Sequence, residues 1–324
     1  MSQIEVLKAA LDKEIAQHPY GLNPVELYEP IQYLMDLQGK RLRPLLTLLS
    51  VSLFSDNWKV ALQPAHAVEV FHNFTLMHDD IMDNAPVRRG SPTVHMKWNE
   101  NTAILSGDVM LVKAYELFLN LPADMLPEVL RRFSRTAAEV CEGQQLDMNF
   151  ETARRVSIAD YIEMIRLKTS VLLGFALELG ALIGRADREC TEKLYEAGVN
   201  MGLGFQLMDD LLDVYGDPEK FGKQVGGDII SNKKTYLYLK ALELGGQEAR
   251  EELTELFSGT PADGSDKITR VTAIYNDLNI KKITGRLIES YFDKAIEAIG
   301  SLPVDGDRKQ QLLTFIVYLM NRDR

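Results

Sequence analysis

Two short stretches of the chain carry three carboxylates each at identical spacing. They are Asp79-Asp-Ile-Met-Asp83 and Asp209-Asp-Leu-Leu-Asp213, and each follows a largely apolar run. In a helix the first and third aspartates of each stretch share a face, so each pair can chelate a cation. Carboxylates without Cys or His partners suit a hard ion such as Mg²⁺. We therefore expect one shared magnesium site built from Asp79, Asp80, Asp83, Asp209, Asp210 and Asp213.

Both aspartate stretches are predicted to end a helix. Pro86 and Gly90-Ser-Pro92 stop the helix that carries the first stretch, and Gly216-Asp-Pro218 stops the second. Free carbonyl groups give a helix C-terminus partial negative charge, so acidic side chains are unfavourable there unless a cation binds. A metal therefore explains the two stretches better than a solvated acidic face does.

Basic residues beside glycine or proline provide candidate contacts for an anionic substrate. They lie in Gly39-Lys-Arg-Leu-Arg-Pro44, Arg88-Arg-Gly90, Lys168-Thr169, Gly222-Lys223 and Asn232-Lys-Lys-Thr235. Arg suits phosphate as a forked donor and Lys as a point charge. Each segment alone is compatible with ordinary surface charge. Together with the metal motifs they favour a diphosphate site.

The elements that must position these residues are predicted to be helices. Helical periodicity fills nearly every segment between breakers, and no run of alternating β-branched residues stands out, so the predicted fold class is all-α. We find no composition shift that marks a domain boundary and expect one domain, residues 1–324. The expected helices are 3–18, 27–38, 43–54, 64–83, 101–119, 124–150, 158–184, 188–216, 231–244, 247–257, 265–276, 279–298 and 306–321.

Composition excludes several classes of function. The 324 residues carry a net charge of -11, which argues against broad binding to nucleic acid or anionic lipid. Cys141 and Cys190 are too few for a disulfide framework or a zinc-cysteine site, and we expect both to be buried thiols. The N-terminus lacks a signal-peptide core, and the apolar run 171–184 is short and contains Glu178. These features predict a cytoplasmic protein with no stable membrane insertion.

The order of the motifs resembles the polyprenyl synthetase family, the trans-isoprenyl diphosphate synthases. The matching motifs run from about Gly39 to Lys234. They are Gly-Lys-Arg-x-Arg-Pro, Phe-His-x-x-x-Leu-x-His-Asp-Asp-x-x-Asp, Arg-Arg-Gly-x-Pro-Thr-Val-His, Gly-Gln-x-x-Asp, Lys-Thr, Gly-x-x-Phe-Gln-x-x-Asp-Asp-x-x-Asp, Gly-Lys and Gly-Asp. The resemblance implies a bundle of about 10 to 13 helices around a central apolar cavity, the isoprenoid synthase fold.

The resemblance also implies a role for each motif position. Asp79, Asp83 and Asp209 resemble the main ligands of about three Mg²⁺ ions, and the other three aspartates complete the clusters. Positions that contact the allylic diphosphate correspond to Arg88, Lys168, Lys223 and Lys233. The pocket for isopentenyl diphosphate corresponds to Gly39, Lys40, Arg43, His72 and Arg89. Polar groups near a developing carbocation correspond to Thr169 and Gln206, and a supporting pair to Gln144 and Asp147.

The implied activity is a short-chain trans-prenyltransferase. Such an enzyme condenses isopentenyl diphosphate with dimethylallyl, geranyl or farnesyl diphosphate by ionisation, condensation and elimination, and it is a homodimer. Large residues upstream of the first aspartates set the chain length in this family, and the candidates here are Phe74, Thr75 and Phe71. An aromatic residue at Phe74 without an insertion in the motif resembles the geranylgeranyl (C20) type, with farnesyl (C15) as the other product.

Two other functions remain open at the level of sequence. A class I terpene cyclase shares the helical fold, but the set Lys40, Arg43, His72 and Arg89 argues against it. A non-catalytic subunit of a heteromeric synthase would be expected to lose aspartates, whereas this chain keeps all six. We expect His78 and His95 to form structural hydrogen bonds.

Overall fold

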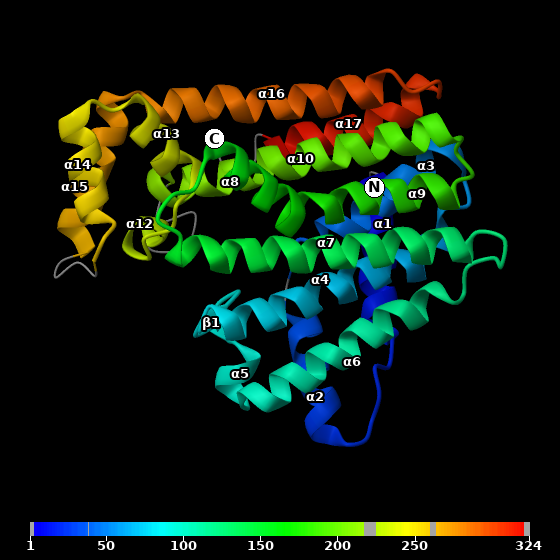
Figure 1. Ribbon diagram of the computed structural model, residues 1–324. Coiled ribbons are helices and arrows are strands. Elements are labelled where there is room, and N and C mark those ends of the chain that lie inside the picture. Colours follow the sequence, from blue (N-terminus) through cyan, green and yellow to red (C-terminus); the bar gives the residue numbers. More distant parts are fainter. Residues whose placement is uncertain (1–2, 38, 217–224, 260–263, 321–324) are drawn as a thin grey trace. The chain divides into compact units, whose positions relative to one another are not determined.

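The structure is a computed structural model that describes residues 3–37, 39–216, 225–259 and 264–320 (Figure 1). Helices make up most of the described chain, which confirms the all-α prediction. The strands among these residues are β1 (Val87–Arg88) and β2 (Ser91–Pro92), which pair antiparallel. Among the described helices, none combines the length and the apolar character needed to cross a lipid bilayer.

The chain divides into two compact units. Unit 1 comprises Met1–Thr136, Leu172–Tyr195 and Ile299–Thr314, and unit 2 comprises Ala137–Val171, Glu196–Ala298 and Phe315–Arg324. The two aspartate stretches fall in different units, Asp79–Asp83 in unit 1 and Asp209–Asp213 in unit 2. Each stretch is therefore built by its own set of neighbours.

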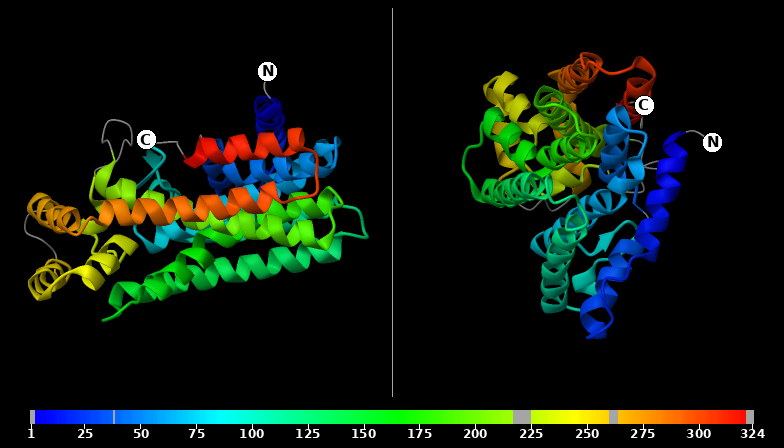
Figure 2. Two further views of the ribbon diagram at one scale, coloured as in Figure 1. Left: turned by 90° about the horizontal axis from the view of Figure 1, so that it is seen from above. Right: turned by 90° about the vertical axis from the view of Figure 1, so that its right-hand side faces the viewer.

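Unit 1 is organised around the helix that carries the first aspartates. This helix, α4 (Leu62–Met82), packs on α1 (Gln3–Gln17), α2 (Val25–Asp36), α3 (Leu42–Phe54) and α6 (Glu100–Phe118) (Figures 1 and 2). Its buried side chains point in most directions, as expected for a helix surrounded by others. Unit 1 also contains η1 (Trp58–Ala61), α5 (Val94–Lys97), most of α9 (Val171–Ile183) and the first part of α7 (Leu126–Thr152).

Unit 2 holds the second aspartates on α10 (Arg188–Tyr215), whose first turns belong to unit 1. Around this helix unit 2 contains α8 (Ile158–Ile165), η2 (Arg166–Ser170), α12 (Gly227–Ile230), α13 (Tyr236–Leu244), α14 (Gln247–Leu256), α15 (Gly264–Asp277) and most of α16 (Ile280–Gly300). Helix α13 packs on α8, and α14 lies beside α15 (Figure 1). Helix α17 (Gly306–Met320) starts in unit 1 and ends in unit 2.

Within the described residues the predicted helices agree with the structure to within a few residues, with two exceptions: the π-turn η2 interrupts the segment 158–184, and the helix expected over 231–244 is shorter. The helix expected over 231–244 starts only at Tyr236, because Asn232 has a φ of 57°. The sequence also missed the β1–β2 hairpin, in which Arg89 (φ 52°) and Gly90 (φ 75°) form a two-residue turn. Positive φ at both central residues is what a type I′ hairpin turn requires.

The two cysteines differ from each other in burial. Cys190 is buried as predicted, whereas Cys141 is exposed, so the prediction for Cys141 is wrong. Cys141 lies on α7, and helical periodicity does not by itself say which side of a long helix is covered.

Candidate active site

The first aspartate cluster lies at the C-terminus of α4, as predicted. Asp83 is the residue that caps this helix, and its backbone N–H donates to the carbonyl oxygen of Asp79 at 2.9 Å. The three side chains differ in exposure: Asp80 is 2% exposed, whereas Asp79 is half-buried and Asp83 is exposed. The open side of the cluster is thus formed by the first and third aspartates.

The β1–β2 hairpin ties down the middle aspartate of this cluster. Arg88 Nε donates to both carboxylate oxygens of Asp80 at 2.8 Å, while Arg88 Nη2 lies 3.7 Å from Asp79 Oδ2. Burial raises the pKa of Asp80, and the Arg88 guanidinium opposes that shift. The tight turn at Arg89 and Gly90 reverses the chain directly after Arg88. Asp80 is therefore held by the protein itself.

The second cluster repeats this arrangement with different partners. Asp210 is 4% exposed, and it accepts hydrogen bonds from the Tyr161 hydroxyl and from Gln206 Nε2, the latter at 3.2 Å. Asp209 is exposed and Asp213 is half-buried. In both clusters the middle carboxylate is held by neutral or cationic donors, and the outer two lie on the more open side.

Carboxyl groups crowd together around the second cluster. The backbone N–H of Asp228, in α12, donates to Asp213 Oδ2 at 3.0 Å, which brings a further carboxylate close. Burial, followed by the charge of Asp228, raises the pKa of Asp210 to about 8 and that of Asp213 to about 6. A divalent cation would relieve this repulsion. Because the donors are carboxylate oxygens, the set fits a hard ion such as Mg²⁺.

Lys168 and Thr169 lie on a π-helical turn, η2, inside the segment predicted as one continuous helix. Lys168 Nζ contacts Asp147 Oδ2 at 2.6 Å, and the Thr169 hydroxyl donates to Gln206 Oε1 at 3.2 Å. A hydrogen-bonded chain therefore runs from Thr169 through Gln206 to Asp210. Irregular π-turns of this kind are frequent at functional sites.

Two glycines let neighbouring helices pack against this π-turn. A Cβ added at Gly143 in α7 would lie 2.1 Å from the backbone nitrogen of Lys168, and one added at Gly202 in α10 would lie 2.5 Å from Ser170 Cα. Backbone atoms cannot yield as flexible side chains do, so both positions require glycine. Their roles were not predicted, since only the folded contacts reveal them.

Basic residues of unit 1 gather around His72. Arg43 Nη1 and His72 Nε2 lie 3.1 Å apart, and Arg89 Nη1 donates to the carbonyl oxygen of Leu37 at 3.3 Å. Burial and the nearby arginines lower the pKa of His72 well below its ordinary value, so this imidazole is neutral. A Cβ added at Gly39 would lie 3.0 Å from the Arg89 guanidinium. Four predicted isopentenyl diphosphate positions thus lie in one neighbourhood, and the exposed Lys40 follows Gly39.

Arg41 stabilises this neighbourhood, although no role was predicted for it from the sequence. Its φ is 50°, and its Nη1 atom lies 2.6 Å from Glu69 Oε1 in a buried ion pair. Its Nη2 atom donates to the carbonyl oxygen of Met35 at 2.5 Å. Asn73 Nδ2 also donates to Glu69 Oε1 at 3.1 Å. Arg41 therefore fastens the segment before α3 to α4.

The remaining predicted positions have different surroundings. Lys223 lies outside the described residues. Lys233 Nζ lies 3.8 Å from Asp228 Oδ1, while the neighbouring Lys234 donates to the carbonyl oxygen of Phe150 at 2.6 Å near the end of α7. Gln144 Nε2 is buried and has no hydrogen-bond partner among the described residues, so this donor is available to a ligand.

The residues upstream of the first aspartates differ in environment. Phe71 is 0% exposed and packs edge-on against Phe133 at 5.1 Å, as an ordinary core residue does. Phe74 contacts the rings of Phe71 and His78 at 5.6 and 4.8 Å. The Thr75 hydroxyl donates to the carbonyl oxygen of His72 at 2.8 Å.

The two histidines expected to be structural also differ. His78 Nε2 lies 3.2 Å from the carbonyl oxygen of Ile104, as expected for a structural histidine. His95 Nδ1 has no hydrogen-bond partner among the described residues.

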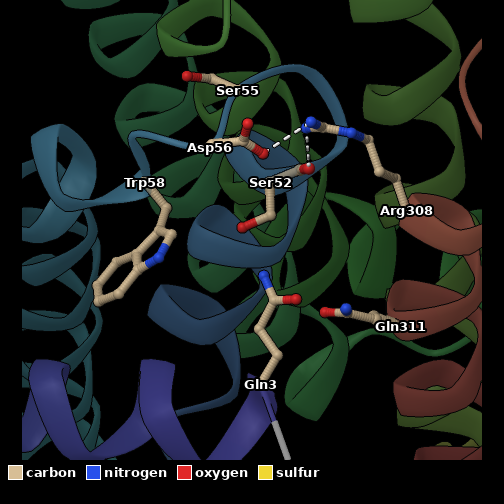
Figure 3. A pocket seen from close by; sticks show the side chains of 7 residues that line it. All are labelled: Gln3, Ser52, Ser55, Asp56, Trp58, Arg308 and Gln311. Atoms are coloured by element: carbon tan, nitrogen blue, oxygen red, sulfur yellow. Dashed lines mark hydrogen bonds and ion pairs between the residues drawn. The ribbon is translucent and has the colours of Figure 1, made fainter.

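A cavity elsewhere in unit 1 contains none of the predicted residues. Its volume is about 290 Å³, and Figure 3 shows Arg308 reaching across it to Asp56 and to the backbone of Ser52. Its other lining residues are Gln3, Ser55, Trp58 and Gln311. Because Arg308 is paired with a carboxylate at 2.7 Å, the cavity offers no unbalanced charge to a diphosphate.

Comparison with known proteins gives a consistent result. The polyprenyl synthetase family model matches residues 24–277. The chain is 45% identical over 225 residues to a geranylgeranyl diphosphate synthase from Methanosarcina mazei, covering 68% of this chain and 69% of that one. It is 38% identical over 240 residues to a geranylfarnesyl diphosphate synthase from Natronomonas pharaonis, covering 68% and 70%.

Solved structures resemble the whole fold. A crystal structure of a geranylgeranyl pyrophosphate synthase superposes with a TM-score of 0.95 at 47% identity and covers 100% of both chains. A polyprenyl synthase from Caulobacter crescentus, complexed with calcium and isoprenyl diphosphate, superposes with a TM-score of 0.88 at 28% identity. The superposition covers 99% of this chain and 96% of that one.

The fold is all-α, two helices end in Asp-Asp-x-x-Asp, and basic residues lie beside the first of these clusters. Together these features define an isoprenyl synthase. This chain belongs to the polyprenyl synthetase family, and it is a prenyltransferase.

Proposed function

We propose that this prenyltransferase condenses isopentenyl diphosphate with an allylic diphosphate and that its main product is geranylgeranyl diphosphate (C20), with farnesyl diphosphate (C15) as the alternative. The basic neighbourhood of Arg43, His72 and Arg89 carries this proposal, because it supplies a second anion site beside the first aspartates. The family match spans parts of both units, which supports one functional domain over residues 1–324.

Mg²⁺ is the proposed cofactor, about three ions for each active site. Asp79, Asp83 and Asp209 would be its main ligands, and Asp213 would complete the second cluster. Asp80 and Asp210 would act mainly by positioning, since Arg88 and Tyr161 already hold them. When bound, Mg²⁺ supplies positive charge that stabilises the leaving diphosphate.

The chain's own residues perform the rest of the reaction. Arg88, Lys168, Lys223 and Lys233 bind the allylic diphosphate, and Gly39, Lys40, Arg43, His72 and Arg89 bind isopentenyl diphosphate. Ionisation of the allylic C–O bond leaves a carbocation, which the oxygens of Thr169 and Gln206 stabilise. The double bond of isopentenyl diphosphate attacks this cation. The proton lost in the last step goes to the released diphosphate, so the protein needs no separate base.

The direct test follows pyrophosphate release and product formation by the purified chain. We expect release only when Mg²⁺, isopentenyl diphosphate and an allylic diphosphate are all present, and loss of release when a chelator is added. Release from the allylic substrate alone, with a cyclic hydrocarbon as product, would instead identify a terpene cyclase. A chain active only after addition of a second protein would be a subunit of a heteromeric synthase.

We propose that the side chain of Phe74 limits the length of the product by blocking further growth of the isoprenoid chain. It is 8% exposed, and it lies beside the fully buried Phe71 on α4. We expect Phe74→Ala to make room for a longer isoprenoid chain and to shift the products to chains at least one isoprene unit longer. Chromatography of the dephosphorylated alcohols measures this shift.

The matched control for Phe74→Ala is Phe118→Leu. Phe118 packs against Phe133 and Phe175 in the same aromatic group, so its replacement should lower stability without changing product length. Identical products from the wild type and from Phe74→Ala would show that Phe74 does not limit product length.

A homodimer is the proposed assembly, and α6 offers a surface for it. Leu105, Val112 and Leu119 are 58%, 55% and 59% exposed, and their spacing of seven residues places them on one side of the helix. We expect Val112→Glu to convert the dimer to a monomer in light scattering, because a charge cannot be buried between two copies. Val60→Glu, at a valine that is 51% exposed in η1, is the control and should remain dimeric. A monomeric wild type would refute the dimer.

A further inference from the structure

A cluster of one carboxylate and two imidazoles lies in unit 1 outside the aspartate motifs. Glu14, His18 and His66 each offer one possible metal-ligand atom, and these atoms all lie within 4.8 Å of one another. Glu14 belongs to the last turn of α1, His18 directly follows that helix, and His66 lies in the first turns of α4. Because α1 packs on α4, the cluster joins two parts of the chain that are distant in sequence.

His66 carries a buried nitrogen that its surroundings leave unsatisfied. Its side chain is 0% exposed, and its Nε2 atom lies 2.7 Å from the Tyr20 hydroxyl. Its Nδ1 atom is buried and has no hydrogen-bond partner among the described residues. Buried polar side-chain atoms are nearly always paired, so this nitrogen calls for a partner that the protein itself does not provide.

The Tyr20 contact favours a metal ligand at that nitrogen. If Nε2 carries the ring proton and donates it to the Tyr20 oxygen, Nδ1 keeps a free lone pair. Histidines that bind metals usually donate their other ring N–H in this way, which fixes the tautomer and the ring orientation. Tyr20 is itself only 2% exposed, and its ring stacks edge-on with that of His18 at 5.2 Å.

The charges around the cluster also suit a cation. Burial lowers the pKa of His18, and it lowers that of His66 to about 3, so both imidazoles are neutral near pH 7. The cations whose charge acts on these imidazoles are already paired, Lys113 with Glu116 at 2.8 Å and Arg41 with Glu69 at 2.6 Å. Glu14 therefore supplies a carboxylate beside two neutral nitrogen donors.

We propose that Glu14, His18 and His66 bind a divalent transition-metal ion of the Zn²⁺ type, with His66 Nδ1 as one ligand and water in the fourth position. Imidazole and carboxylate ligands suit such an ion, whereas the oxygen-only aspartate clusters suit Mg²⁺. Bond lengths of about 2.0–2.2 Å place tetrahedral ligands about 3.4 Å apart. The half-buried Glu14 and His18 therefore close on the ion when it binds, and this fastens the segment after α1 to α4.

The test uses the chelator-treated full-length protein in excess Mg²⁺. Calorimetric titration with Zn²⁺ should reveal one site for each chain, and Co²⁺ in its place should give the visible absorption of a tetrahedral nitrogen-containing site. His18→Gln and Glu14→Gln should weaken binding about tenfold or more. Zn²⁺ should raise the melting temperature of the wild type but not that of these variants, since only a bound ion stabilises the fold.

Two variants distinguish this site from others. Asp12→Asn, an exposed carboxylate on the same helix, should bind Zn²⁺ as the wild type does, and so should Asp79→Asn. His66→Gln, in contrast, should lose the site as His18→Gln and Glu14→Gln do, and circular dichroism confirms that this variant is folded. Absence of a Zn²⁺ site in excess Mg²⁺, or unchanged binding by His18→Gln and Glu14→Gln, would overturn the proposal. Prenyltransfer does not enter any of these measurements, so their outcome is independent of the proposed reaction.

Discussion

Replacing Asp79 with asparagine should lower kcat by about 10²–10³-fold, the loss typical of removing one group that stabilises charge in a transition state. Asp79 is half-buried on the open side of its cluster, and asparagine keeps its shape while removing its charge. The Mg²⁺ concentration for half-maximal rate should rise as well. Initial rates of pyrophosphate release over a Mg²⁺ series measure both effects.

Asp12→Asn is the control for this change, because Asp12 is an exposed aspartate of the same unit and lies on α1. Its rate should remain that of the wild type. Asp80→Asn offers a contrast, since it also removes the partner of Arg88 and should lower thermal stability together with the rate. An Asp79→Asn enzyme with the wild-type rate and Mg²⁺ dependence would show that Asp79 is not a ligand.

Replacing Arg132 with methionine should destabilise the protein by about 3–5 kcal/mol, because it strands a buried charge. Glu178 lies in the apolar helix α9 and is 3% exposed, and Arg132 of α7 is its ion-pair partner within unit 1. Arg132 Nε also contacts Glu128 Oε1 at 2.6 Å. Without Arg132, Glu178 must be buried as an unpaired carboxylate or take up a proton.

The loss should depend on pH. Burial raises the pKa of Glu178 above its ordinary value of 4.5, and the charge of Arg132 opposes this rise. A carboxyl group whose pKa is raised by folding costs stability as the pH rises above its unfolded value. Since Arg132→Met removes the opposing charge, its destabilisation should be larger at pH 8 than at pH 5. Urea unfolding at the two pH values measures the difference.

The neighbouring Arg131 supplies a matched control. It is 71% exposed and pairs with Glu128 on the surface, so Arg131→Met should cost only about 0–1 kcal/mol. The double variant Arg132→Met/Glu178→Met should regain most of the lost stability, because the buried charge is gone. Equal losses from Arg131→Met and Arg132→Met would mean that the buried pair contributes nothing.

The sequence could predict the helices and the aspartate clusters because both depend on near neighbours. Helical periodicity and breakers place α4 and α10, and a spacing of four residues puts Asp79 beside Asp83. The hairpin after α4 was missed, since its left-handed Arg89 is not a residue that usually signals such a turn.

Sequence alone shows which residue types share a helix. It places three carboxylates at each of two helix ends, with cations before, between and after the two clusters. Which carboxylate of each cluster is held depends on contacts that form only in the folded chain. Asp80 is bound by Arg88 across a hairpin, and Asp210 by Tyr161 from another helix. The same holds for the partner of Glu178 and for the unpaired nitrogen of His66. These contacts join residues distant in the chain, and helical periodicity carries information only about residues a few positions apart.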